Sequence, residues 1–288
     1  MRRIGNASRA LLAACTLAIV AMTGLTVAAS AETTLERIKS DGFIRVGFAN
    51  EAPFGFATKS GTLSGEAPEL AKLVLSKIGD IEMVGVLTEF GSLIPGLLAR
   101  RFDMIAAGMF ILPKRCAQIL FSNPTIGLGQ GFVVKAGNPK DLHSFTDVAE
   151  NSDAILVVVA GGVERDYARD AGIPDDQVVV LPDFPTATAA IQTGRGDALA
   201  LTGLSVQNII DTAGDPDLER ADPYVDLFGR GYSGFGFRKD DADLRDLFNQ
   251  EMAGFVGTQA HLDLIGPLGF GSGEMPGDVT AEELCAGE

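Results

Sequence analysis

The stretch EFGSLIPGLLARRFDMIAAGMFILPKRCAQILFSNP, residues 89–124, decides the fold of this chain of 288 residues. Its first part predicts a helix over 92–101, with Pro95 in the first turn, where the missing N–H breaks no hydrogen bond. An apolar strand over 103–107 follows, and Pro113 begins a second helix. A helix, a short buried strand and another helix in close succession are typical of an α/β layer.

The same alternation extends on both sides of this stretch. Upstream, strands are predicted over 43–49 and 83–87, with a helix between them that Ser64 caps. The predicted downstream strands are 131–135, 154–159, 178–181, 197–201 and 234–238. The predicted downstream helices end at 171, 191, 213, 255 and 265. Such alternation predicts parallel sheets built from right-handed βαβ units.

A short internal echo indicates two halves of related design. Residues 97–108 read LLARRFDMIAAG, and residues 190–201 read AIQTGRGDALAL. In both segments a predicted helix ends and Arg-x-Asp then opens an apolar strand. The echo predicts two α/β lobes, with a chance match as the alternative.

Composition and charge argue against several classes of protein. With 46% apolar and 21% charged residues, the chain is globular rather than disordered. A net charge of −15 repels phosphate backbones, so nucleic acid is a poor partner. Two histidines and three scattered cysteines predict no metal site. No Gly-x-x-x-x-Gly-Lys-Ser/Thr loop occurs, and the Gly-x-Gly-x-x-Gly spacing at 229–234 (GRGYSG) leads into a predicted strand rather than opening a helix, so no nucleotide cofactor is expected.

Residues 1–31 have the pattern of a secretory signal peptide. Three arginines precede an apolar run over 10–29, which ends in Ala29-Ser30-Ala31. Cleavage is expected after Ala31 and the mature chain is expected in the periplasm. An uncleaved membrane anchor is the alternative. A lipid anchor on Cys15 is not expected, because its Leu-Ala-Ala-Cys box lies ahead of most of the apolar run.

Loss of that segment leaves Cys116 and Cys285. Two cysteines in an exported protein most often pair, so a disulfide is predicted, with two free thiols as the alternative. A catalytic cysteine is not expected, because His143 and His261 belong to no recognisable motif.

From about Leu35 to Gly269 the chain resembles the periplasmic solute-binding proteins of ABC importers, in the polar-amino-acid group. Besides the opening stretch, the matching segments are LERIKSDGFIRVGFANEAPFGF (35–56), SGEAPELAKLVLSKIG (64–79) and GRGDALALTGLS (194–205). The resemblance implies a type II fold, with two parallel-sheet lobes joined by two crossing strands. Lobe 1 would comprise 32–134 plus 233–288, and lobe 2 would comprise 135–232. It also implies a ligand in the cleft between lobes that close on it, a membrane permease as partner, and a monomer.

The resemblance predicts which residue binds a ligand carboxylate, and it shows that an acid that commonly binds a ligand ammonium is missing. Arg115 matches the family arginine that binds a ligand carboxylate as a two-pronged pair. In amino-acid binders the strand equivalent to 197–201 usually ends in an aspartate that accepts the ligand's ammonium. Here that position is Thr202 or Gly203, and burying an unpaired ammonium is costly. The implied ligand therefore has no free ammonium group.

Phe54, Phe90 and Phe110, the last just after Gly108, match cleft positions where aromatic rings face the ligand. An aromatic box suits a delocalised cation, and ordinary core packing is the alternative. Glu51 would accept N–H groups from such a cation. The set of Glu51, Phe54, Phe90, Phe110, Arg115 and the following Cys116 resembles the ectoine and 5-hydroxyectoine-binding proteins and implies a zwitterionic compatible solute. The expected ligand-binding residues are Glu51, Phe54, Phe90, Gly108, Phe110, Arg115, Gly162, Val163 and Thr202.

Two positions depart from that pattern. Phe90 stands where tyrosine is common, and Val163 stands where the family usually has threonine. Carboxylate binding would then depend on Arg115 and on backbone N–H groups at the helix start after Gly162. A betaine or modified amino-acid carrier, a partner-dependent sensor, and a periplasmic dehydratase with Glu51 as general acid are the alternatives. An enzyme is not expected.

Overall fold

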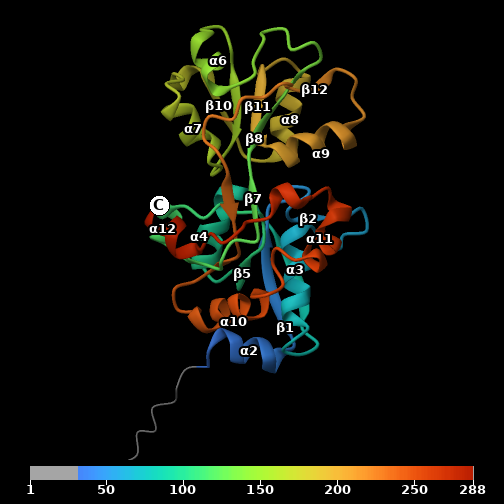
Figure 1. Cartoon of the computed structure of the whole chain (residues 1–288), viewed down its shortest axis with the longest axis vertical. Coiled ribbons are helices and arrows are strands. Elements are labelled where there is room, and N and C mark those ends of the chain that lie inside the picture. Colours follow the sequence, from blue (N-terminus) through green and yellow to red (C-terminus); the bar gives the residue numbers. More distant parts are fainter. Residues whose placement is uncertain (1–31, 288) are drawn as a thin grey trace, which may run out of the picture. The chain divides into compact units, whose positions relative to one another are not determined.

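A computed structural model describes residues 32–287 (Figure 1). The predicted signal peptide and the box around Cys15 lie outside the described residues. Within 32–287, no helix is both long and apolar enough to cross a membrane.

The first sheet has the strand order β4-β1-β5-β14-β6. Its strands are β1 (Phe43–Phe48), β4 (Glu82–Leu87), β5 (Met104–Ile105), β6 (Leu120–Phe121) and β14 (Gly236–Phe237). β1 runs parallel to β4 and β5, while β14 is antiparallel to β5 and β6. Helices α3 (Glu66–Leu75) and α10 (Ala242–Met252) contribute Leu70, Val74 and Phe248 to the same buried cluster as Ile44 and Val46 of β1. The apolar residues of these helices repeat at the spacing of one helix face, and that face packs in the core.

The second sheet has the strand order β10-β9-β11-β8-β12. Its strands are β8 (Gln130–Lys135), β9 (Leu156–Val159), β10 (Val178–Leu181), β11 (Ala198–Thr202) and β12 (Leu218–Arg220). β10, β9 and β11 are parallel, whereas β8 is antiparallel to both β11 and β12. Helices α8 (Phe184–Gln192) and α9 (Gly203–Ala213) follow two of the parallel strands, as in βαβ units.

Two short strands connect these sheets along the chain. β7 (Ile126–Leu128) leads into β8, and β13 (Gly231–Ser233) leads back to β14; the two are paired antiparallel. The α/β class and the two-strand connection are therefore confirmed. The prediction of parallel sheets is incomplete, because each sheet contains one antiparallel strand. This strand is β14 in the first sheet and β8 in the second, and each follows directly from a connecting strand.

The remaining helices and strands are short. They are α2 (Thr34–Asp41), β2 (Phe56–Ala57), β3 (Leu63–Ser64), α4 (Leu93–Leu98), α5 (Pro113–Cys116), α6 (Phe145–Glu150), α7 (Glu164–Asp170), α11 (Gln259–Ile265) and α12 (Ala281–Ala286). Short 3₁₀ turns occur at Phe90–Ser92, Asp175–Gln177, Gly266–Leu268 and Ser272–Glu274.

Two local predictions were wrong. Ser64 does not cap α3: Gly65, with φ 123°, occupies the cap position, and the Ser64 hydroxyl donates to Glu69 instead. The helix predicted over 92–101 begins as a 3₁₀ turn at Phe90 and its α-helical part ends at Leu98. Arg100 adopts a left-handed φ of 56°, which cannot continue a right-handed helix.

The predicted disulfide is present. Cys116 and Cys285 are bonded, with their Cα atoms 5.6 Å apart. The bond joins α5 to α12, so the helix that carries Arg115 is tied covalently to the C-terminal helix.

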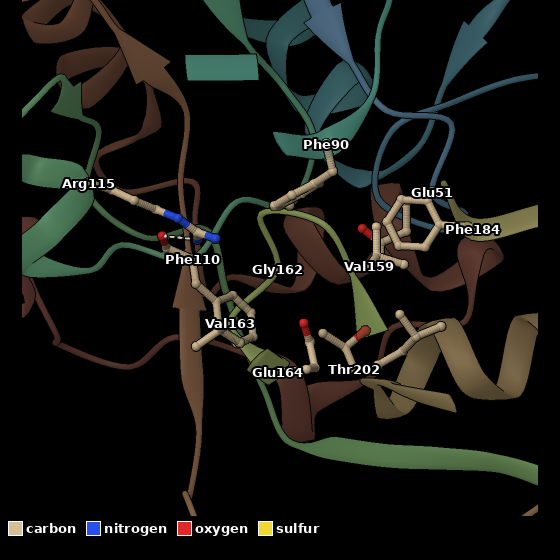
Figure 2. Close-up of a pocket in the computed structure, with 12 residues that line it drawn as sticks. Glu51, Phe90, Phe110, Arg115, Val159, Gly162, Val163, Glu164, Phe184 and Thr202 are labelled. Atoms are coloured by element: carbon tan, nitrogen blue, oxygen red, sulfur yellow. Dashed lines mark hydrogen bonds between the residues drawn. The ribbon is translucent and has the colours of Figure 1, made fainter. Parts of the chain in front are cut away.

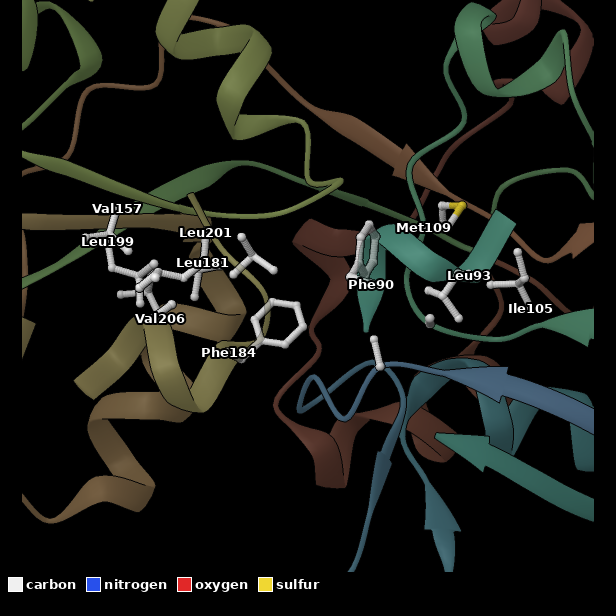
Figure 3. Packing of buried hydrophobic residues seen from close by; sticks show 14 of the residues in the cluster. Phe90, Leu93, Ile105, Met109, Val157, Leu181, Phe184, Leu199, Leu201 and Val206 are labelled. Atoms are coloured by element: carbon white, nitrogen blue, oxygen red, sulfur yellow. The ribbon is translucent and has the colours of Figure 1, made fainter. Parts of the chain in front are cut away.

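One buried cluster draws residues from both sheets (Figure 3). Leu93, Ile105 and Met109 lie in or near the first sheet. The other members named here lie in the second sheet or in α9: Val157, Leu181, Leu199, Leu201 and Val206. Phe90 and Phe184 meet edge to face between them, with ring centroids 6.3 Å apart. The cavity described next adjoins these two rings.

Candidate functional site

A cavity of about 400 Å³, partly open to solvent, lies between segments that belong to the two sheets (Figure 2). The lining residues are Glu51, Phe90, Gly108, Phe110, Arg115, Val159, Gly162, Val163, Glu164, Phe184, Leu201 and Thr202. Eight of the nine predicted ligand-binding residues therefore line one cavity, and Phe54 is the exception.

Arg115 is held in place by backbone carbonyls. Pro113 begins the short helix α5, and from its third residue the guanidinium reaches the oxygens of Phe110 at 2.7 Å and Gly161 at 2.9 Å (Figure 2). It also lies 5.6 Å from the centre of the Phe90 ring. Burial lowers the pKa of Arg115 to about 10, so the group stays charged at neutral pH. Each terminal nitrogen carries two N–H groups, which leaves one on each to donate to a ligand carboxylate.

Glu51 follows β1 and is buried against α9. Its Oε1 accepts a hydrogen bond from the Ser205 hydroxyl at 2.6 Å, and the Thr202 hydroxyl donates to Ser205 in turn at 3.2 Å. Burial raises the pKa of Glu51 to about 8 against the effect of the Ser205 hydrogen bond, and the charge of Glu164 adds to the rise. At neutral pH a carboxyl with this pKa is mostly protonated, and a cation or several N–H donors close to it would favour its ionised form.

Glu164 is a second buried carboxyl in the cavity that the sequence reasoning missed. It is the first residue of α7, where an acid is ordinary, so its type and position carried no signal. Burial raises its pKa to about 7, partly offset by its own backbone N–H and by the charge of Arg115. With its amide nitrogen turned toward these atoms, Gln130 donates to Leu201 O at 3.1 Å and to Glu164 Oε1 at 3.2 Å.

The Glu164 carboxyl lies close to the backbone N–H groups of Val163 and Glu164, which act to lower its pKa. Donation of N–H groups at the start of α7 to a ligand carboxylate stays a prediction. A Cβ on Gly162 would lie 2.3 Å from Glu164 Oε2, so a side chain at this position would displace the Glu164 carboxyl. Val163 is buried and caps α7 without a side-chain hydrogen bond. Among the described residues that line the cavity, Arg115 is the one with a positive charge, and it can bind a ligand carboxylate.

The aromatic box differs from the predicted one in a single member. Phe54 does not line the cavity: it is 1% exposed and packs edge to face on Phe270, with centroids 5.7 Å apart. It also fills the space at Gly108, where a Cβ would lie 2.7 Å from the Phe54 ring. Phe184, the first residue of α8, takes a place in the cavity wall beside Phe90. Three phenylalanine rings thus line the cavity, as expected in number but not in identity.

The charge balance of the cavity is one arginine against two carboxyls. Thr202 ends β11 and contributes a hydroxyl rather than a charge. No cluster of three or more possible metal ligands occurs among residues 32–287. The arrangement suits a small molecule that presents a carboxylate to Arg115 and N–H donors to the carboxyls.

Two α/β sheets linked by a pair of strands, with a cavity between them, define a type II periplasmic binding protein. Residues 44–259 match the bacterial extracellular solute-binding proteins, family 3, and the chain belongs to that family. The chain is therefore the solute-binding component of an amino-acid-type ABC importer, with a small-molecule ligand and a membrane permease as partners.

Individual relatives agree with this assignment. The chain is 35% identical to the probable amino-acid ABC transporter periplasmic-binding protein y4tE of Sinorhizobium fredii over 263 residues, which covers 88% of this chain and 86% of that protein. Among solved structures, EhuB in complex with hydroxyectoine is 36% identical, with a TM-score of 0.81 over 89% of this chain and 99% of that one. The ancestral amino-acid-binding protein AncCDT-1, described as a precursor of cyclohexadienyl dehydratase, is 25% identical, with a TM-score of 0.71 over 82% and 99%.

Proposed function

We propose that this protein captures a zwitterionic compatible solute, ectoine or 5-hydroxyectoine, for its importer. The observation that carries the proposal is the cavity wall of Phe90, Phe110 and Phe184 around the charges of Arg115 and Glu51. The likeness to EhuB, solved with hydroxyectoine, supports the same ligand class.

Each part of such a solute has a matching group in the cavity. The carboxylate would accept the two remaining N–H groups of Arg115. The amidinium ring would lie against the phenylalanine faces, each worth about 0.5–2 kcal/mol when water is excluded. Its N–H groups would donate to Glu51, whose pKa would then fall below the value that burial imposes.

A second candidate is a carrier for a cationic amino acid. Two buried carboxyls, Glu51 and Glu164, face a single arginine, and a ligand with one extra positive charge would neutralise all three groups. In this case Glu164 would take the role of the aspartate that the end of β11 lacks.

Export and domain division belong to the same proposal. Residues 1–31 would be removed in the periplasm, and mass spectrometry of the exported chain should find Glu32 at its N-terminus. The chain would act as a monomer, with lobe 1 formed by 32–134 plus 233–288 and lobe 2 by 135–232. It would turn over neither prephenate nor arogenate, and release of product from either would contradict the proposal.

The deciding experiment is calorimetric titration of residues 32–288, unfolded and refolded to remove carried-over ligand. Ectoine, hydroxyectoine, glycine betaine, arginine and glutamate would be titrated separately. We expect micromolar or tighter binding of ectoine or hydroxyectoine and none of glutamate. Tight binding of arginine with no ectoine signal would replace the proposal with the second candidate. Binding of betaine as tight as that of ectoine would mean that Glu51 accepts no ligand N–H.

A further inference from the structure

A second cavity, of about 720 Å³ and open to solvent, adjoins the first and shares Glu51 and Phe184 with it. It lies between the loop after β1 and one face each of α8 and α9. Its other lining residues are Asn50, Ala52, Pro185, Thr188, Ser205, Asn208, Ile209, Thr212 and Ala213. In α9 these residues are spaced three and four apart, as expected for one side of a helix.

The side chains of Glu51, Thr202 and Ser205 lie at the boundary between the two cavities. Ser205 lines the second cavity and Thr202 lines the first. The Thr202 hydroxyl donates to the Ser205 hydroxyl, which in turn donates to Glu51 Oε1. Glu51 is 8% exposed, and its Oε2 accepts no hydrogen bond from residues 32–287. A mostly buried carboxyl with one accessible oxygen that has no donor therefore lies where the cavities meet, and this oxygen can accept a hydrogen bond from a ligand N–H.

The walls of the second cavity limit what can enter it. Asn50, Thr188, Asn208 and Thr212 are polar but uncharged, and Glu51 is the only ionisable residue among those that line it. A carboxylated or phosphorylated group would lie beside the ionised Glu51 without a cation to balance it, and the two like charges would repel each other. Hydroxyl, ether and amide groups would find hydrogen-bond partners there.

We infer that the second cavity is a subsite for an uncharged polar extension of the solute, attached next to the N–H group that binds Glu51. This inference rests on the proposed function. In a cyclic amidinium, the carbon between the two nitrogens carries a substituent directly beside the N–H groups. A solute that donates one of these N–H groups to Glu51 directs that substituent toward the second cavity.

The test compares three probes: ectoine, an analogue with a 2-hydroxyethyl group in place of the ring methyl, and an analogue with a 2-carboxyethyl group there. In the wild type, the hydroxyethyl compound should bind as tightly as ectoine, to within about threefold. The carboxyethyl compound should bind at least about tenfold more weakly. Asn208→Trp places a large side chain in the second cavity only, so it should weaken the hydroxyethyl compound about tenfold or more while ectoine changes less than about twofold.

Gln207→Trp is the matched control, because Gln207 is the neighbouring residue on α9 and lines neither cavity. It should leave both affinities and the melting temperature unchanged. Equal losses for ectoine and the hydroxyethyl compound in Asn208→Trp, or much weaker binding of the hydroxyethyl compound by the wild type, would overturn the subsite while leaving the proposed function intact. Failure of ectoine itself to bind would overturn the proposed function and the inference together.

Discussion

Ligand affinity should rise with pH, because a proton on Glu51 competes with the ligand. Burial raises the pKa of Glu51 to about 8, whereas the carboxyl of an unfolded chain ionises near 4.5. A solute that presents N–H groups and positive charge needs the ionised form of Glu51. Binding at neutral pH therefore has to release the proton that the empty site holds.

The size of the effect follows from that pKa. At pH 7 a group with a pKa of about 8 is about one-tenth ionised, which costs the complex about 1.4 kcal/mol. We expect the dissociation constant to be about tenfold higher at pH 7 than at pH 9, and about a hundredfold higher at pH 6. A zwitterion carries one cation, so only one of the two carboxyls, Glu51 or Glu164, has to ionise. Below about pH 7 the dissociation constant should therefore rise by about one decade for each pH unit, and above pH 8 the dependence should flatten.

Calorimetric titration with ectoine between pH 6 and pH 9, in two buffers of different ionisation enthalpy, measures both the affinity and the protons released. We expect about 0.9 protons released at pH 7. Glu51→Gln should weaken binding and remove the pH dependence. Glu150→Gln, at the exposed end of α6, should change neither. An affinity that stays constant from pH 6 to pH 9, or equal proton release by Glu51→Gln and the wild type, would refute the reasoning.

Three further predictions concern the rings, the core and the approach of the two halves. Phe184→Leu keeps an apolar side chain but removes a ring, so ectoine affinity should fall about 2- to 30-fold, whereas Phe145→Leu, in a separate core cluster, should leave it unchanged. Glu66 is fully buried, and burial raises its pKa to about 7. Its neutral form therefore contributes fully to stability below about pH 4.5, and this contribution is lost as the pH rises through 7. Glu66→Gln should therefore raise stability at pH 8 by up to about 3 kcal/mol in urea unfolding, and a loss of stability at pH 8 would contradict this account. Gly161 has φ +83°, and a Cβ on it would lie 2.4 Å from Gly91 Cα. Gly161→Ala should therefore weaken the affinity for ectoine about tenfold or more in calorimetric titration. An unchanged affinity would show that this close approach is not needed for binding.

Local patterns predicted most elements with small errors at their ends. The strand predicted over 178–181 has the bounds of β10, and α11 ends at Ile265, where the last predicted helix ends. Asp183 caps α8 by accepting a hydrogen bond from Thr186 N. These features depend on neighbouring residues only, which is why periodicity and capping chemistry predict them. Ser64 failed as a cap because Gly65, one residue later, adopts a positive φ that begins α3 in its place.

The sequence by itself determined the α/β class, the disulfide pair and the presence of Arg115 in the cavity, since each has a local motif or a cysteine count behind it. Only the tertiary structure decided that Phe184 and Glu164 line the cavity while Phe54 packs behind Gly108. Both missed residues begin helices, where their types are ordinary. Their role arises because the turns after β9 and β10 bring those helix starts beside residues far away in the chain, and no local periodicity encodes such contacts.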